Sequence, residues 1–495
     1  MSLLDEMRAR YGMRPSVAAM REESRRSDLR KTLGWKQLTA LGVGAIVGAG
    51  VFSVIGVAAA ETGPAVAISF IVAALVALLA ALAYAELAAM LPVAGSAYTY
   101  GYVAGGELFA WLIGWALILS YGIGNAALAS SFSDNLTGLL GRTFNWDVPV
   151  AFTATPGVDA ATGSATLFDV PALLIVLLIT FLLLRPVRES ALVNALLVVL
   201  KLGVLALFLV VALPRGDAAN LTPFAPFGLP SILSGAALIF FAYLGFDAIS
   251  TAAEETRDPQ RDLPRGIIGS LVITTALFVT LAIALTAVAR YDTLGTGEPL
   301  AIALDAAGFP GLGAVMNIGG LVAALSVLLV FQLATVRVVL ALCRDGLLPP
   351  WLATVSREHA TPNRLTLILG ITVAVFSAVV PLGLLVIVTN LAALFIFGGV
   401  MLALLLLRRH SPDAPRAFRC PAVPLLPMIG IAATLGLAIL AILVEPVTGI
   451  GFVGWMGLGM MVYAAYGARN SALRARAHAR AGEDDGADAP APGDT

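Results

Sequence analysis

The stretch PAVAISFIVAALVALLAALAY, residues 64–84, contains no charged residue. A helix of about 20 apolar residues spans the ~30 Å hydrocarbon core of a bilayer, because each residue rises ~1.5 Å along the axis. A second stretch, residues 191–213, is apolar apart from one charged side chain, Lys201. Both stretches therefore predict helices that cross a membrane.

The rest of the chain repeats this pattern. Of its 495 residues, 59% are hydrophobic and only 12% are charged, whereas soluble domains carry roughly 25% charged residues. No segment alternates in the manner of a membrane β-barrel, so we expect an all-α integral membrane protein. Twelve apolar runs predict its transmembrane helices, at 38–60, 66–91, 107–135, 169–184, 192–213, 231–254, 265–289, 311–343, 365–380, 382–407, 425–443 and 450–467.

The lysines and arginines predict the orientation of these helices, because cytoplasmic segments are enriched in them. With a cytoplasmic N-terminus, the tail at 1–37 holds nine and the other inner segments hold sixteen, whereas the outer loops hold only Arg142, Arg215 and Arg290. We therefore expect a multi-pass plasma-membrane protein with both termini in the cytoplasm. The segment 468–495 is expected to be a disordered tail, since it ends in an acidic stretch rich in Ala, Gly and Pro.

The sequence favours neither a metal site nor an enzyme. Cys343 and Cys420 fall on the predicted cytoplasmic side, where thiols stay reduced. The three histidines are too scattered to form a metal site, and the predicted spans contain no nucleophile–base constellation. We expect no cofactor and no nucleic acid partner, and we predict that a proton gradient drives any transport. The oligomeric state stays open.

Two of the predicted helices contain features that interrupt a helix. Residues 42–52 read GVGAIVGAGVF, with four glycines in nine positions at mid-span, where each costs a helix about 1 kcal/mol. Taken alone, this stretch is explained equally well by close helix packing through Gly44 and Gly48. The sixth helix reads FFAYLGFD at 240–247, with a lone glycine and the carboxylate of Asp247. Interruptions at matching positions in two halves of a chain favour unwinding around a central binding site.

The ends of such broken helices predict what would bind there. Amide groups near Ala49 and Gly50 begin a half-helix and suit a carboxylate. Carbonyl groups freed near Phe241, Ala242 and Leu244 suit an ammonium group. An α-amino acid carries both groups on one carbon, and it is therefore the predicted substrate.

Five stretches, spread through residues 33–466, resemble the amino acid–polyamine–organocation superfamily, specifically its bacterial cationic-amino-acid-transporter-like branch. They are GVGAIVGAGVF at 42–52, LAYAELAAMLPVAGSAYTY at 82–100, FFAYLGFDAISTAAEETRDPQRDLPRGII at 240–268, ALCRDGLLP at 341–349 and PRAFRCPAVPLLP at 415–427. The resemblance implies a leucine-transporter-type fold, in which helices 1–5 (38–213) and 6–10 (231–407) form inverted repeats and two further helices (425–467) follow.

The resemblance also implies roles for individual residues. Ile46, Ala49 and Gly50 would contact the substrate carboxylate, and Gly48 lies in the same segment. Phe241, Ala242 and Leu244 would contact its amine, with Phe241 also gating the outer path. Asp247 either faces this site or accepts hydrogen bonds from the free amides of helix six, and the sequence does not choose between the two.

Lys201 lies at the middle of the fifth predicted helix, where a charge costs at least ~2.5–3.5 kcal/mol to insert. One interpretation is an ion pair that locks helices together. The other is proton coupling, because burial disfavours the charged form of an amine. The resemblance supports coupling, since the family places a lysine ammonium where sodium-coupled relatives hold Na⁺. We predict Lys201 as the proton-responsive residue, with helix one and Ser326 of helix eight beside it. For Glu86, near the cytoplasmic end of helix two, structural pairing with a loop is favoured.

Together these features predict a secondary transporter that imports α-amino acids by alternating access. Relatives with cationic substrates often carry acidic residues in the third helix where this chain has Ala116 and Ser120, which favours neutral substrates. Exchange of amino acids or polyamines is the alternative to proton symport. A sensor that binds an amino acid without transporting it shares all of these features.

Overall fold

The computed structural model describes residues 31–92, 96–146, 148–158, 164–184, 191–354 and 362–471, with the backbone alone at 191–194. Residues 1–30 of the predicted N-terminal tail and 472–495 of the predicted C-terminal tail lie outside this description.

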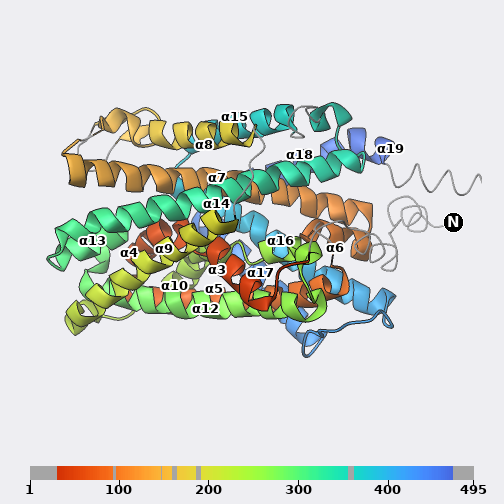
Figure 1. Ribbon diagram of the computed structural model, residues 1–495, viewed down its shortest axis with the longest axis horizontal. Coiled ribbons are helices and arrows are strands. Elements are labelled where there is room, and N and C mark those ends of the chain that lie inside the picture. The colour runs from red at the N-terminus through yellow and green to blue at the C-terminus, as the bar shows by residue number, and fades with distance from the viewer. Residues whose placement is uncertain are drawn as a thin grey trace, which may run out of the picture.

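The described chain is almost entirely helical (Figure 1). Its helices are α3 (Trp35–Ile46), α4 (Ile55–Thr62), α5 (Val66–Met90), α6 (Ser96–Gly105), α7 (Glu107–Phe144), α8 (Val170–Leu183), α9 (Ala191–Ala212), α10 (Gly228–Ile239), α11 (Ala248–Thr251), α12 (Pro259–Val288), α13 (Pro299–Ala306), α14 (Pro310–Arg344), α15 (Asn363–Val379), α16 (Leu382–His410), α17 (Leu425–Val444), α18 (Pro446–Val462) and α19 (Ala468–Asn470). Three short helical segments also matter below: the π-helix η1 (Gly50–Val54) and the 3-10 helices η3 (Val150–Phe152) and η6 (Phe240–Tyr243). A two-stranded antiparallel hairpin, β1 (Gly157–Val158) with β2 (Ala165–Thr166), follows η3.

Each of the twelve predicted apolar runs coincides with helix. Within the described residues, nine helical segments have the length and hydropathy to cross a membrane, and α8 and α15 are shorter apolar helices. The sequence did not predict α6 or α13, which are short and lie between the apolar runs. It also ended the third helix too early. Because α7 continues to Phe144, Arg142 belongs to its last turn and not to a loop.

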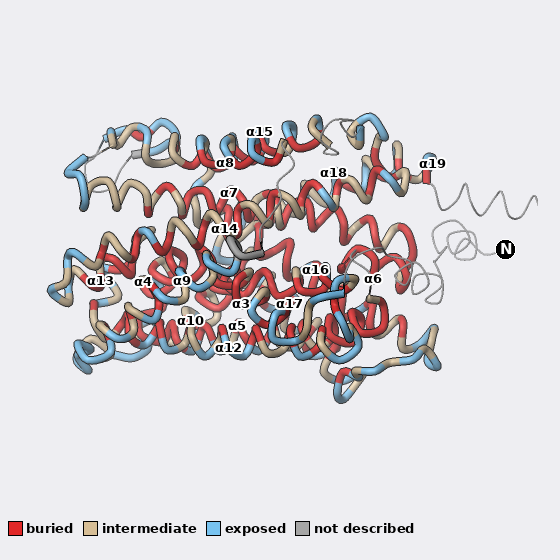
Figure 2. Tube along the Cα trace, viewed as in Figure 1, coloured by how far each residue is buried: buried red, intermediate tan, exposed pale blue. Residues whose placement is uncertain are grey.

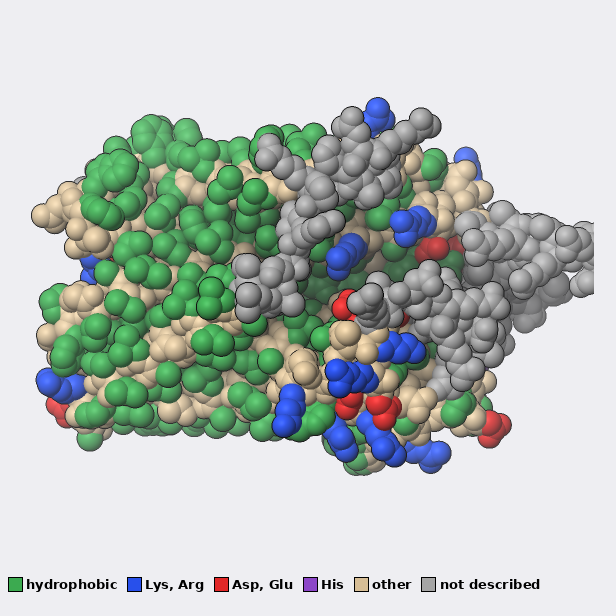
Figure 3. Space-filling model, in the orientation of Figure 1, with side chains coloured by type: hydrophobic (Ala, Val, Ile, Leu, Met, Phe, Trp, Pro, Cys, Tyr) green, Lys and Arg blue, Asp and Glu red, His purple; other side chains and the backbone are tan. Residues whose placement is uncertain are grey.

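The helices form two groups (Figure 1). In one, α12 packs against α3 and α5, and α5 packs against α10. In the other, α7 packs against α14 and α8, and α8 packs against α15. Burial is greatest where the groups meet, whereas α8, α12 and α15 have exposed outer faces (Figure 2). The flank of the molecule is covered by hydrophobic side chains, and lysines and arginines gather toward the end where α6 and α19 lie (Figures 1 and 3). Such an apolar flank is suited to a bilayer.

The end of the bundle near α6 is tied together by a buried carboxylate. Glu86 of α5 is fully buried, and its two oxygens accept hydrogen bonds of 2.8 Å each from the guanidinium of Arg408 in α16. Nε of Arg416, in the loop after α16, lies 3.0 Å from Oε1 of Glu86, and the amide of Cys420 donates to Oε2 at 2.7 Å. The predicted structural pairing of Glu86 with a loop is confirmed.

Candidate functional site

The first predicted helix is broken. Its first half, α3, ends at Ile46, and Val47 adopts an extended conformation before the chain resumes helical turns at Ala49. The glycines around the break serve two purposes. A Cβ on Gly44 would collide with Val198 of α9, so this glycine allows close packing. A Cβ on Gly50 would overlap the backbone of Ala242, so that glycine lets the two broken helices touch. Packing and unwinding, the two alternatives for this stretch, therefore both occur.

The sixth predicted helix is broken at the same level. After α10 the chain tightens into η6, Leu244 is extended, and Gly245 has a φ of +116°, which is strained for any residue with a Cβ. A Cβ on Gly245 would lie 2.7 Å from the carbonyl oxygen of Ala45. The break in one helix is thus packed directly against the break in the other.

A small enclosed space lies between these breaks and the second group of helices. Helices α3, η1 and η6 with their adjoining residues supply one wall, and α7 and α14 supply the other. Its lining residues are Ala45, Ile46, Gly48, Ala49, Gly50, Leu128, Phe241, Leu244, Val327 and Phe331. The free volume is about 10 Å³, which is room for about one water molecule. The cavity in this closed conformation is therefore too small to hold an amino acid.

Six of the predicted substrate residues line this space: Ile46, Gly48, Ala49, Gly50, Phe241 and Leu244. Ala242 does not line it and packs against Gly50 instead. The sequence predicts a free carbonyl at Phe241, but this carbonyl accepts a 3.2 Å hydrogen bond from the amide of Leu244. That part of the prediction is wrong. The contacts of these residues with a substrate stay a prediction.

Asp247 lies outside the lining of the cavity. Its side chain is buried and accepts a 2.6 Å hydrogen bond from the hydroxyl of Tyr121 on α7. This hydrogen bond thus comes from a side chain of α7 and not from an amide of helix six, and the choice between the two interpretations of Asp247 stays open. Tyr121 in turn packs against Phe331, a cavity residue, with ring centroids 5.3 Å apart.

The side chain of Lys201 is fully buried in α9, and it reaches across to the break. Its Nζ donates to the carbonyl of Gly44 at 2.5 Å and to the hydroxyl of Ser326 in α14 at 2.9 Å. In an uninterrupted helix the Gly44 carbonyl would accept from the amide of Gly48, but the break at Val47 removes that turn and leaves the carbonyl to Lys201. No carboxylate of the described residues forms an ion pair with Lys201.

Several residues at the site gave no signal in the sequence. Leu128, Val327 and Phe331 are apolar residues within apolar helices, and only the fold reveals that they face the cavity. Ala116 and Ser120, where the sequence had sought a determinant of substrate charge, are buried in α7 but do not line the cavity. No cavity-lining side chain is charged.

A buried polar network beside the cavity was also missed. The side-chain amide of Asn125 in α7 donates to Gln332 in α14, and Gln332 donates to Thr180 in α8 at 3.1 Å. These bonds join three helices of the second group close to Leu128 and Phe331.

The fold and this site define the class of the protein: a multi-pass α-helical membrane protein whose closed central cavity lies between two groups of helices. The model of the family described as amino acid permease matches residues 33–466. The chain belongs to this amino acid permease family, within the amino acid–polyamine–organocation superfamily that its motifs resemble.

Its relatives are transporters and not enzymes. The chain is 40% identical to the branched-chain amino acid permease BcaP of Bacillus subtilis (strain 168) over 446 residues, covering 90% of this chain and 95% of that protein. It is 38% identical to the methylthioribose transporter of the same organism, covering 91% and 96%. It is 36% identical to the vacuolar cationic amino acid transporter 4 of Arabidopsis thaliana, covering 78% of this chain and 64% of that one.

Proposed function

We propose that this protein is a secondary active transporter that imports α-amino acids across the plasma membrane by alternating access. The observation that carries the proposal is the meeting of two helix breaks at a closed cavity between two groups of helices. Backbone groups at such breaks bind polar substrates, and relative movement of the groups would open the cavity to each side in turn. The proposal includes twelve spans, with 38–213 and 231–407 as inverted repeats and both termini in the cytoplasm.

The lining of the cavity supports a neutral, apolar substrate side chain. The carboxylate would bind near Ala49 and Gly50, and the ammonium near Phe241 and Leu244. Leu128, Val327 and Phe331 would then surround the substrate side chain. A second positive charge on the substrate would find no carboxylate among the lining residues, and leaving a charge unpaired at mid-membrane is costly. The similarity to a branched-chain amino acid permease agrees with this assignment.

Lys201 is proposed as the proton-coupling residue, with Ser326 as its partner. Its amine bridges the two groups, because Gly44 belongs to α3 in the first and Ser326 to α14 in the second. A protonated amine donates stronger hydrogen bonds than a neutral one. Protonation would therefore hold the groups together, and deprotonation would weaken this bridge between them.

The test is uptake of labelled leucine into proteoliposomes, with and without an inward proton gradient. The native protein is compared with Lys201→Ala and with Gly203→Ala, a matched control on the same helix where an added Cβ meets nothing within 4 Å. Concentrative uptake that needs the gradient, is lost in the Lys201 variant and persists in the control is the expected result.

Other outcomes separate the alternatives. Uptake only into vesicles preloaded with amino acid would identify an exchanger. Binding without flux, across a panel with leucine, arginine, polyamines and methylthioribose, would identify a sensor and refute transport. Preference for methylthioribose, the substrate named for a relative of nearly equal similarity, would refute the zwitterion site.

A further inference from the structure

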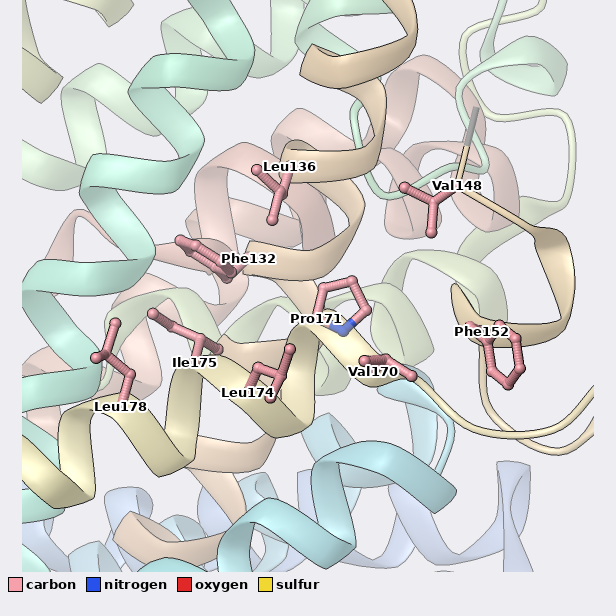
Figure 4. A pocket seen from close by; sticks show the side chains of 9 residues that line it. All are labelled: Phe132, Leu136, Val148, Phe152, Val170, Pro171, Leu174, Ile175 and Leu178. Atoms are coloured by element: carbon pink, nitrogen blue, oxygen red, sulfur yellow. The ribbon is translucent and has the colours of Figure 1, made fainter. Parts of the chain in front are cut away.

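A second cavity lies on the flank of the molecule, apart from the central site. It has a volume of about 450 Å³. One wall is formed by Phe132 and Leu136 of α7, another by Leu174, Ile175 and Leu178 of α8, and the far end is covered by Phe152 of η3 (Figure 4). We call this space the α7–α8 groove. Every residue that lines it is apolar.

We infer that the α7–α8 groove is a binding site for one acyl chain of a membrane phospholipid. The first argument is its position. The groove opens onto a part of the surface where Leu174 and Leu178 are 56% and 54% exposed. Large exposed apolar side chains on a membrane-spanning helix face the hydrocarbon of the bilayer. The groove is therefore continuous with a surface that lipid already covers.

The second argument is its depth. The groove follows α8 from Val170 to Leu178, a distance of about 12 Å along the helix axis. One leaflet contributes about half of the ~30 Å hydrocarbon core. Exposed aromatic side chains flank the end of the groove that Phe152 covers: Trp146 lies two residues before Val148, and Phe168 packs against Phe152 with ring centroids 5.5 Å apart. Tryptophan is enriched at the level of lipid headgroups, so the groove extends from the level of Trp146 through most of one leaflet.

The third argument is its chemistry and size. A space lined only by apolar side chains offers water no hydrogen bonds, and an empty space would leave its walls without van der Waals partners. A flexible hydrocarbon chain satisfies these walls. A helix of a second protein copy is about 10 Å across with its side chains and does not fit a groove of about 450 Å³.

The α7–α8 groove and the central cavity share helix α7. Phe132 lies one turn along α7 from Leu128, which lines the central cavity. The acyl chain therefore packs against the same helix that contacts the proposed substrate. The inference rests on the twelve-span arrangement of the proposed function, in which α8 crosses the membrane, but its test is separate because lipid can be detected without transport.

The experiment uses the full-length protein in vesicles of phosphatidylcholine and phosphatidylglycerol that contain a small fraction of phosphatidylcholine with a photoactivatable diazirine on one acyl chain. After irradiation, adducts are mapped by mass spectrometry. Peptides that cover 170–178 are compared with those that contain Val453 of α18, which is 66% exposed and lines neither cavity. We expect several-fold more adduct on α8 than on α18.

A groove-filling variant tests the assignment further. Leu174→Trp places a bulky indole ring in the groove at a half-exposed position, so the buried core is left intact. Val453→Trp is the matched control. The excess labelling of α8 should be lost in the first variant and kept in the second. Equal labelling of α8 and α18 in the native protein would overturn the inference without any variant. So would a protein–protein cross-link through α8, which would assign the surface to a second copy of the chain.

Discussion

Replacement of Glu86 by alanine should destabilise the protein, because Glu86 holds several charged and polar groups together at the α6 end of the bundle. Glu86 is fully buried, and Arg416, whose Nε lies 3.0 Å from it, is only 2% exposed. Loss of the carboxylate would leave that guanidinium buried without its counter-charge and would also leave the amide of Cys420 without its acceptor. Breaking a buried ion pair by removing one partner costs about 3–5 kcal/mol.

The contribution of Arg408 to this loss is smaller. Its side chain is 26% exposed, so water can solvate the guanidinium once Glu86 is absent. Glu86→Gln should lie between the native protein and the alanine variant, because the amide keeps one oxygen acceptor and the shape of the side chain but loses the charge.

The assay is thermal unfolding in detergent, followed by size-exclusion chromatography of aliquots heated to increasing temperatures. We expect the midpoint of Glu86→Ala to fall by several degrees. The control is Asp292→Asn, which breaks the exposed ion pair with Arg290 and should leave the midpoint unchanged. If Glu86→Ala and the native protein have the same unfolding midpoint, the buried ion pair contributes nothing to stability and the reasoning is wrong.

Three further predictions test other parts of the structure. Burial, with a smaller contribution from the Glu86 carboxylate, raises the pKa of Cys420 to about 11. In a chain whose other cysteine is serine, iodoacetamide should therefore alkylate Cys420 slowly at pH 7, and the rate should still be rising above pH 8. A rate that reaches a plateau near pH 8 would contradict this. Gly245→Ala should abolish uptake, because Gly245 has a φ of +116° and an added Cβ would press on the Ala45 carbonyl. Gly203→Ala should leave uptake unchanged. Equal uptake by the two variants would show that the two helix breaks need not touch. Arg142 forms ion pairs with Glu298 at 3.0 Å and with Asp305, which lie at the first and the last turn of α13. Arg142→Ala should therefore speed hydrogen exchange in α13 but not in α17, and unchanged exchange in α13 would count against a restraining role.

The sequence alone determined that this chain forms apolar helices and where most of them lie. The reason is physical: the thickness of the bilayer imposes a length on every span, and the cost of exposing backbone groups to lipid leaves helices as the form available to such runs. The breaks in the first and sixth helices were also visible, because glycines at mid-span are unfavourable unless the backbone needs them there. A buried lysine was conspicuous for the same kind of reason, namely its cost.

Only the tertiary structure decided what these features touch. Lys201 meets Gly44, 157 residues away, and Tyr121 meets Asp247, 126 residues away, and no local pattern encodes such pairs. The cavity walls at Leu128, Val327 and Phe331 look like every other apolar position in their helices. Which face of an all-apolar helix turns toward a neighbour, a cavity or lipid depends on how the helices pack together, and packing is a property of the assembled bundle.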